Sequence, residues 1–189
     1  MASPTVLYDA CVLYPAPLRD LLMYLALTGL FQAKWSNQIH DEWIRNVLKN
    51  RPDLKREQLE RTRELMDAHV RDGRVEDYEH LIEAVTLPDP DDRHVLAAAI
   101  ASNANLILTF NRKDFPRPSL EPYDIEARHP DKFIADLLDR DAETVCAAVK
   151  RHRASLRYPP KTVDEYLAII EQQGLSATVA ILRGFAEVL

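Results

Sequence analysis

Two aspartates in this chain stand where a metal or phosphate site is commonly built. Asp9 directly follows the apolar run Thr5–Tyr8, which we expect to form a buried strand. Asp114 comes five residues after a second such run, Leu106–Thr109. Because ligands bind at the carboxyl ends of strands in open parallel sheets, both carboxylates are placed to hold a cation, and Asp9 could also act as a nucleophile. The structural alternative for Asp9 is a helix cap or a turn.

A third group of acids opens a predicted helix over residues 91–102. Asp89, Pro90 and Asp92 fit the N-cap, N1 and N3 positions, so capping alone could explain the cluster. Asp92, however, shares a helix face with the apolar residues Val95, Leu96 and Ala99. An ion at the head of an apolar stripe costs free energy unless something pairs with it. We therefore expect a functional role for Asp92, whereas Asp89 fits a cap.

Glu42 lies on a predicted helix over residues 38–48 and borders its apolar side. Asp41 beside it competes for any role, and the pattern alone is typical of an ordinary surface acid. Carboxylates and water are the ligands that Mg²⁺ and Mn²⁺ prefer. Four acids from separate segments could thus converge at one edge of a sheet, namely Asp9, Glu42, Asp92 and Asp114. No pair of histidines has the spacing of zinc ligands.

Strand and helix patterns alternate in the first two thirds of the chain, which favours an α/β domain with a parallel sheet. From about His129 only helical patterns follow, at 130–139, 141–156, 162–173 and 175–188. The sequence thus predicts an α/β domain over residues 1–128 and a helical extension over 129–189. Apolar positions of the extension should pack on the α/β domain because they form faces too large to leave exposed: Leu137, Leu138, Val145, Val149, Leu167, Ile170, Val179 and Leu182.

Composition limits the possible functions. A chain of 189 residues fits one domain with an appendage, and its net charge of −6 argues mildly against nucleic-acid binding. Any such contact must come from a local patch, and residues 149–161 carry five Lys or Arg and no acid. This run could contact RNA phosphates or an acidic partner protein, or be ordinary surface charge. Without a signal peptide or an apolar run long enough for a bilayer, we expect a cytoplasmic protein with no membrane partner.

Several motifs resemble those of PIN-domain ribonucleases. Residues 7–13, LYDACVL, are similar to the opening strand of that family, and residues 92–99, DRHVLAAA, resemble its second acidic helix. The run 106–116, LILTFNRKDFP, resembles its last motif, and Glu42-Trp43 matches the family's single glutamate between the first two motifs. The piece from Tyr158 onward resembles the C-terminal region of VapC-like toxins of type II toxin–antitoxin systems.

This resemblance implies a twisted parallel sheet flanked by helices and a Mg²⁺- or Mn²⁺-dependent hydrolysis of RNA phosphodiester bonds. It also implies Asp9, Glu42, Asp92 and Asp114 as catalytic metal ligands. Arg112 and Lys113, supported by Asn111, would hold the RNA. The alternative for Arg112 and Lys113 is that they are ordinary charged residues of a solvent-exposed loop. The implied partners are RNA, an antitoxin protein and, as is common in the family, a second copy of the chain.

Two departures from the family pattern bear on activity. Asn111 stands where many members carry Asp, which puts a second metal in doubt, and Cys11 stands where Ser or Asn is frequent, which could loosen a hydrogen bond to Asp9. Two alternatives to the nuclease remain open here. One is a degenerate PIN module that only binds RNA or protein. The other is a phosphatase of the haloacid-dehalogenase type, against which Cys11 counts because such enzymes usually carry a second Asp there.

Overall fold

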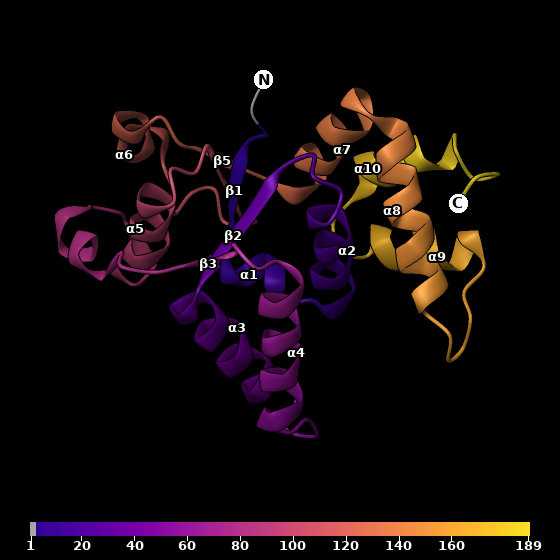
Figure 1. Ribbon diagram of the computed structural model, residues 1–189, viewed down its shortest axis with the longest axis horizontal. Helices are drawn as coiled ribbons and strands as arrows, with labels where there is room; N and C mark the ends of the chain where they lie inside the picture. The colour runs from indigo at the N-terminus through magenta and orange to yellow at the C-terminus, as the bar shows by residue number, and fades with distance from the viewer. Residues whose placement is uncertain (1–2) are drawn as a thin grey trace.

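The computed structural model describes residues 3–189, so the first two residues of the predicted α/β domain lie outside the described residues. Its centre is a five-stranded sheet with every neighbouring pair parallel, in the order β3-β2-β1-β4-β5. Figure 1 shows α5 and α6 on one side of this sheet and α2 and α7 on the other. The predicted fold class, a parallel sheet flanked by helices with further helices at the C-terminus, is confirmed.

The two predicted strands form the middle of the sheet. They are β1 (Thr5–Tyr8) and β4 (Leu106–Leu108), and their side chains from Val6 to Tyr8 and at Ile107 and Leu108 are fully buried. Strands covered on both faces read as continuous apolar runs, which is why the sequence revealed them. Three further strands carry polar residues and were not predicted: β2 (Gln32–Ser36), β3 (Arg74–Val75) and β5 (Glu126–Arg128).

Two helices before β4 agree with the predicted segments to within a few residues, α3 (Asn37–Asn50) and α5 (Arg93–Ala101). The other helices before β4 are α1 (Ala10–Leu13), α2 (Ala16–Ala26) and α4 (Arg56–His69). Between β3 and α5 lie two 3-10 helices. They are η1 (Glu79–Ala84) and η2 (Pro90–Asp92), and η2 leads directly into α5. After β4 come α6 (Arg117–Leu120) and η3 (Glu121–Tyr123).

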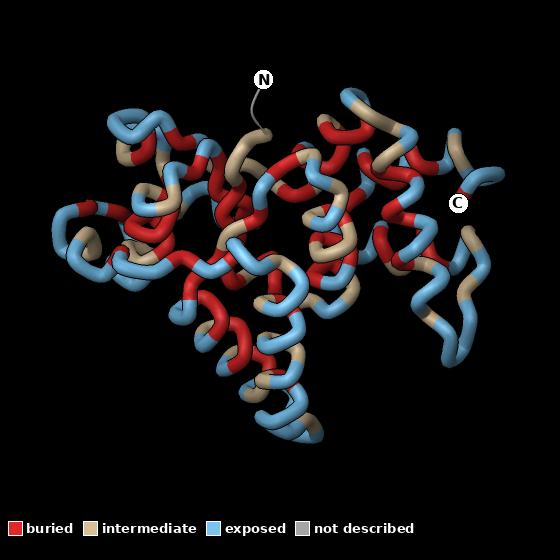
Figure 2. Tube along the Cα trace, in the orientation of Figure 1, coloured by how far each residue is buried: buried red, intermediate tan, exposed pale blue. Residues whose placement is uncertain are grey.

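The helices α3 and α4 form a projection from the end of the sheet, and Figure 2 shows that its tip is exposed. Its base is fixed by a buried hydrogen-bond network. Trp43 Nε1 donates to His40 Nδ1 at 3.0 Å, and Asp67 on α4 lies 3.2 Å from His40 Nε2. Trp35 of β2 donates to the same Asp67 oxygen at 2.7 Å. Because these side chains come from β2, α3 and α4, the network holds α3 in a fixed position against the sheet.

A close approach of backbone and ring fixes the turn after α4. A Cβ added to Gly73 would lie 2.8 Å from the Trp35 ring, so only glycine fits there without a shift of the ring. The Gly73 carbonyl accepts the Trp35 N–H at 2.8 Å, which starts the pairing of β2 with β3.

The C-terminal region consists of α7 (Pro130–Arg140), α8 (Ala142–Ser155), α9 (Val163–Glu171) and α10 (Ser176–Arg183). It packs on the α/β domain, as predicted. Phe133 meets Phe31 edge to face with ring centroids 5.0 Å apart, and His152 lies 5.3 Å from the Tyr24 ring of α2. All eight apolar positions predicted to be covered are buried: Leu137, Leu138, Val145, Val149, Leu167, Ile170, Val179 and Leu182. The boundary between residues 128 and 129 stays a prediction.

Candidate active site

Asp9 lies where β1 ends and is almost completely buried, with 5% of its surface exposed. Its Oδ1 accepts the Ala10 N–H at 2.7 Å, so the residue also caps the short helix α1. Its Oδ2 accepts from the Thr109 hydroxyl at 2.8 Å and from the Cys11 thiol at 3.2 Å. Burial raises the pKa of Asp9, while the Thr109 and Cys11 hydrogen bonds lower it. The carboxylate is thus held in one orientation by donors from the ends of both central strands.

Thr109, which the apolar pattern indicated only as the end of a strand, positions the Asp9 carboxylate. It is fully buried, and its hydroxyl oxygen also accepts the Asn111 N–H at 2.9 Å. One hydroxyl therefore links Asp9 to the loop that follows β4. The available signal was a hydroxyl residue at the end of the apolar run Leu106–Leu108.

Cys11 keeps contact with the aspartate rather than loosening it. Its sulfur lies 3.2 Å from Asp9 Oδ2 and accepts the Phe110 N–H at 3.3 Å. Burial, together with the neighbouring Asp9 charge, raises the pKa of the Cys11 thiol to about 12. The thiol therefore stays protonated at neutral pH and can donate to the carboxylate, so the hydrogen bond that Cys11 was expected to loosen is present.

Asp92 begins α5, and within the part of the chain that the structure describes its side chain makes no capping hydrogen bond. Asp89 provides the cap instead, since its Oδ1 accepts the Asp91 N–H at 2.9 Å. Burial raises the pKa of Asp92 to about 7, and the charges of four other acids add to this effect in the order Asp9, Asp89, Asp114 and Glu42. Acids from four separate segments of the chain therefore repel one another at this end of the sheet.

Glu42 reaches this region from α3 and is paired with His94 of α5. The distance between His94 Nε2 and Glu42 Oε2 is 3.2 Å, with the two side chains 11% and 26% exposed. The other ring nitrogen of His94, Nδ1, is buried and has no hydrogen-bond partner within residues 3–189. Trp43, the neighbour of Glu42 on α3, packs against Arg19 of α2. The Arg19 guanidinium lies 4.6 Å from the Trp43 ring centre.

A cavity of about 590 Å³ opens between α3 and the start of α5. Five of its lining side chains are acids, and two are basic or titratable nitrogen groups, Arg45 and His94. The lining consists of Gln38, Asp41, Glu42, Arg45, Asn46, Asp89, Asp91, Asp92 and His94. We call this cavity the acid pocket. Of the four predicted ligands, Glu42 and Asp92 line it, whereas Asp9 and Asp114 act on Asp92 through their charges.

The carboxylates in and beside the acid pocket are ligands that suit a hard divalent cation. The four predicted ligands, Asp9, Glu42, Asp92 and Asp114, carry carboxylate oxygens of the kind preferred by Mg²⁺ and Mn²⁺. Burial raises the pKa of Asp92 and the charges of neighbouring acids add to this effect, and a cation would offset that repulsion. Within residues 3–189, no three His, Cys, Asp or Glu side chains stand close enough to enclose an ion as they are placed. Binding would therefore require the carboxylates to draw together around the ion.

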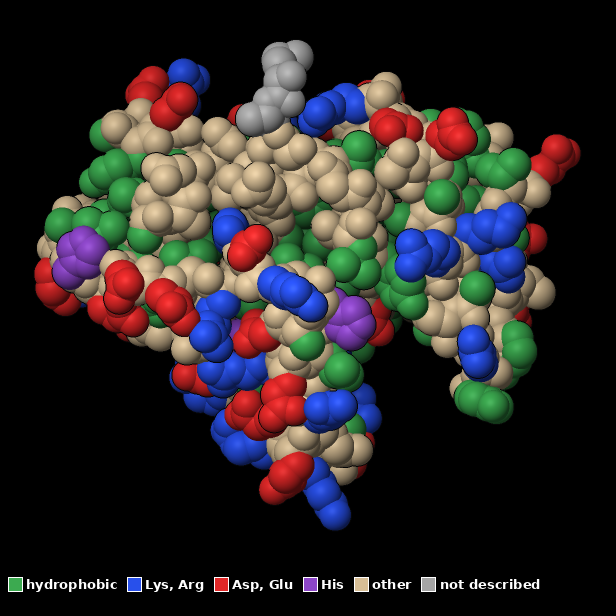
Figure 3. Space-filling view, viewed as in Figure 1, with side chains coloured by type: hydrophobic (Ala, Val, Ile, Leu, Met, Phe, Trp, Pro, Cys, Tyr) green, Lys and Arg blue, Asp and Glu red, His purple; other side chains and the backbone are tan. Residues whose placement is uncertain are grey.

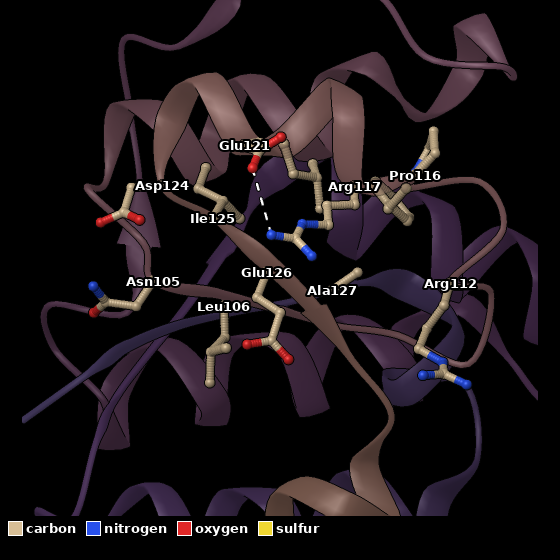
Figure 4. Close-up of a pocket in the computed structure, with 12 residues that line it drawn as sticks. Asn105, Leu106, Arg112, Pro116, Arg117, Glu121, Asp124, Ile125, Glu126 and Ala127 are labelled. Atoms are coloured by element: carbon tan, nitrogen blue, oxygen red, sulfur yellow. Dashed lines mark hydrogen bonds and ion pairs between the residues drawn. The ribbon is translucent and has the colours of Figure 1, made fainter.

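The three predicted RNA-binding residues lie in the loop after β4. Asn111, Arg112 and Lys113 are exposed, and none of them lines the acid pocket. Arg112 instead lines a cavity of about 760 Å³ between β5 and α6. Figure 4 shows Arg112 at one end of this cavity and an ion pair between Arg117 and Glu121 above it. The roles of these three loop residues stay predictions.

The basic run 149–161 is partly occupied within the fold. Arg153 donates to the Leu189 carbonyl at 3.1 and 3.2 Å and to the Lys161 carbonyl at 2.7 Å. Lys150 donates to the Val188 carbonyl at 3.0 Å. Lys150 and Arg153 fix the C-terminal segment against α8. At most the remaining three basic side chains of the run are therefore available for RNA or a partner.

Comparisons with known proteins agree with this arrangement of a parallel sheet flanked by helices. Residues 5–113 match the PIN domain, and the chain belongs to the PIN-domain family. Residues 130–184 match the VapC50 C-terminal domain. Over 82 residues the chain is 42% identical to VapC50 of Mycobacterium tuberculosis, a protein named as a candidate ribonuclease.

That alignment covers 43% of this chain and 48% of the relative, so the chain matches about half the length of VapC50. No solved structure matches the chain. No helix within residues 3–189 is long and apolar enough to cross a membrane.

Proposed function

We propose that this protein is a metal-dependent ribonuclease that hydrolyses RNA phosphodiester bonds and serves as the toxin of a toxin–antitoxin pair. The proposal is carried by the position of Asp9 at the end of β1 and of Glu42 and Asp92 in the acid pocket, where burial and the charges of neighbouring acids raise the pKa of Asp92. Membership of the PIN-domain family and likeness to VapC50 support nuclease chemistry over the phosphatase alternative. The antitoxin partner rests on that likeness alone.

In this proposal Asp9, Glu42 and Asp92 hold Mg²⁺ or Mn²⁺, with Asp114 as a weaker ligand or a residue that positions water. A bound ion would activate water for in-line attack on phosphorus and offset charge on the phosphate oxygens. The chain's own contribution is orientation. Thr109 and Cys11 fix Asp9, His94 fixes Glu42, and the absence of a cap bond leaves the Asp92 carboxylate free to turn toward the ion.

The test is cleavage of a labelled single-stranded RNA with Mg²⁺, with Mn²⁺ and with EDTA, beside turnover of a generic phosphate ester. We expect metal-dependent RNA cleavage and little ester turnover. Asp9→Asn should lower cleavage roughly thousandfold, because the charge stabilisation supplied through the ion amounts to several kcal/mol. Asp139→Asn removes an exposed acid of α7 and is the matched control. Cleavage that survives EDTA, or that Asp9→Asn leaves unchanged, would contradict the proposal.

A further inference from the structure

We propose that Arg45 on α3 binds an RNA phosphate beside the bond to be cleaved, with the Asn46 amide next to it. This inference rests on the proposed ribonuclease function and names the region of the acid pocket that holds the substrate. It assigns to α3 both a metal ligand, Glu42, and the positive charge that brings the polyanion to that metal.

The position of Arg45 follows from helix geometry. Residues three and four apart lie on the same face of a helix, so Arg45 and Asn46 stand one turn after Glu42 on α3. Both side chains line the acid pocket together with Glu42. Arg45 is exposed, which leaves its guanidinium accessible to a ligand entering from solvent.

The Arg45 guanidinium is not engaged elsewhere in the fold. Within the described residues of the chain it forms no ion pair, although acids surround it. Asp41, its neighbour in the pocket, pairs with Arg63 at 2.9 Å, and the arginine that opens α5, Arg93, pairs with Glu83 at 3.4 Å. A phosphate could therefore bind Arg45 without breaking an existing ion pair of that side chain.

The acid pocket requires such a group for electrostatic reasons. Five carboxylates line it, and a phosphodiester approaching them is repelled unless positive charge offsets them. A divalent ion supplies some of that charge. Arginine suits the remainder because its planar guanidinium donates two parallel hydrogen bonds to phosphate oxygens, which a lysine ammonium does not.

The surroundings also favour Arg45 over the bases of the loop after β4. Arg112 lines the separate cavity between β5 and α6 (Figure 4), so a phosphate that contacts it is not held by the acid pocket. Residues 37–69, which span α3 and α4, carry seven Lys or Arg and seven Asp or Glu, so the projection as a whole has no excess of positive charge. Figure 3 shows lysine and arginine side chains on this projection with acidic side chains among them, so a phosphate is drawn to Arg45 by its place in the acid pocket rather than by the charge of the projection.

The experiment measures the salt dependence of RNA binding, which reflects how many phosphates the protein neutralises. A labelled single-stranded RNA is titrated with each protein in Ca²⁺ between 50 and 200 mM salt, and cleavage is measured in Mg²⁺ over the same range. The slope of log K against log salt changes by about 0.7 for each phosphate of a single strand that is no longer neutralised. Arg45→Ala should shallow the slope by about this amount, weaken binding about tenfold, and raise KM more than it lowers kcat.

Three variants make the result specific. Arg45→Lys should restore the slope but only some of the affinity. Asn46→Ala should weaken binding with no change of slope, because it removes no charge. Arg61 of α4 pairs with Glu64 and does not line the acid pocket. Arg61→Ala therefore removes one positive charge from α4 and should leave the slope and the cleavage rate as they are.

The outcomes separate this inference from the function on which it rests. If the wild type cleaves RNA and Arg45→Ala changes neither slope nor KM, the inference is wrong and the ribonuclease proposal stands. An equal change in Arg45→Ala and Arg61→Ala means that general charge attracts RNA, which also overturns it. A wild type that neither cleaves nor binds RNA removes the proposed function, and Arg45 with it.

Discussion

The acid pocket and the packing of the C-terminal helices both bury ionisable side chains, but they do so with opposite consequences. At the acid pocket, like charges from several segments meet, and the pKa of Asp92 rises to about 7. Between α2, α8 and α9, His152 is buried without a charged partner, and desolvation lowers its pKa to about 4. The first region holds charges that a ligand must offset, and the second keeps its titratable group neutral.

The two regions should therefore respond to pH in opposite directions. A carboxyl whose folded-state pKa is raised contributes stability at low pH, which is lost as pH rises through the window from about 4 to about 7. A histidine whose folded-state pKa is lowered contributes stability above its unfolded value, which is lost as pH falls from 6.5 to about 4. Burial is the main cause of both pKa shifts, but at Asp92 the charges of neighbouring acids add to it, whereas at His152 burial acts alone.

The largest effect is expected at His152. Its Nδ1 lies 2.9 Å from the Tyr166 hydroxyl, and its Nε2 is buried with no partner within residues 3–189. Since each pKa unit is worth about 1.4 kcal/mol, acidification across the window should cost about 3 kcal/mol of unfolding free energy. Chemical denaturation of the wild type and His152→Gln between pH 7 and pH 4 measures this, with exposed His80→Gln as the control. Equal pH dependence in all three proteins would show that His152 is not the source.

The next effect concerns Asp92 and the metal. Mn²⁺ at ~100 times its dissociation constant should stabilise the wild type by roughly 2.7 kcal/mol. Asp92→Asn removes repulsion and a ligand at once, so the metal-free variant should be slightly more stable, respond less to Mn²⁺ and lose RNA cleavage. Thermal melts with and without Mn²⁺ check this. If the variant keeps both the Mn²⁺ shift and cleavage, Asp92 only forms the start of α5.

A buried threonine from each region gives a matched comparison. Thr109→Val removes the hydroxyl that donates to Asp9, and Thr178→Val removes one that donates to the Asp131 carbonyl at 3.1 Å. Both threonines are fully buried, so both substitutions should cost stability. Only Thr109→Val should weaken Mn²⁺ binding, by about 10- to 100-fold, as measured by calorimetry. Equal Mn²⁺ affinity in the two variants would count against a positioning role for Thr109.

The smallest effect is expected at Asp131, whose carboxylate caps α10 across the C-terminal helices. Its oxygens accept the Ala177 N–H at 3.0 Å and the Thr178 N–H at 2.8 Å. Asp131→Ala should cost about 1 kcal/mol, and Asp131→Asn less, with RNA cleavage unchanged in both. Denaturant unfolding and cleavage assays measure the two quantities. A loss of activity without a loss of stability would mean that α10 acts on the acid pocket.

Much of the fold could be predicted because local pattern decided it. The strands β1 and β4 are covered on both faces and were evident as apolar runs, whereas β2 was missed because Lys34 and Gln32 interrupt its buried residues Ala33 and Trp35. The edge strand β5 is short and carries Glu126 and Arg128, so its composition does not distinguish it from a loop.

The sequence by itself determined which acids stand at strand ends and at the head of a helix, since hydrophobic periodicity and capping act over a few residues. Only the tertiary structure decided what those acids meet. Thr109 reaches Asp9 across 100 residues of sequence, and His94 reaches Glu42 across 52. It also assigned Arg45 to the acid pocket and Arg112 to a different cavity. Such contacts depend on strand order, register and the angle at which α3 leaves the sheet, and no local pattern in the chain encodes these.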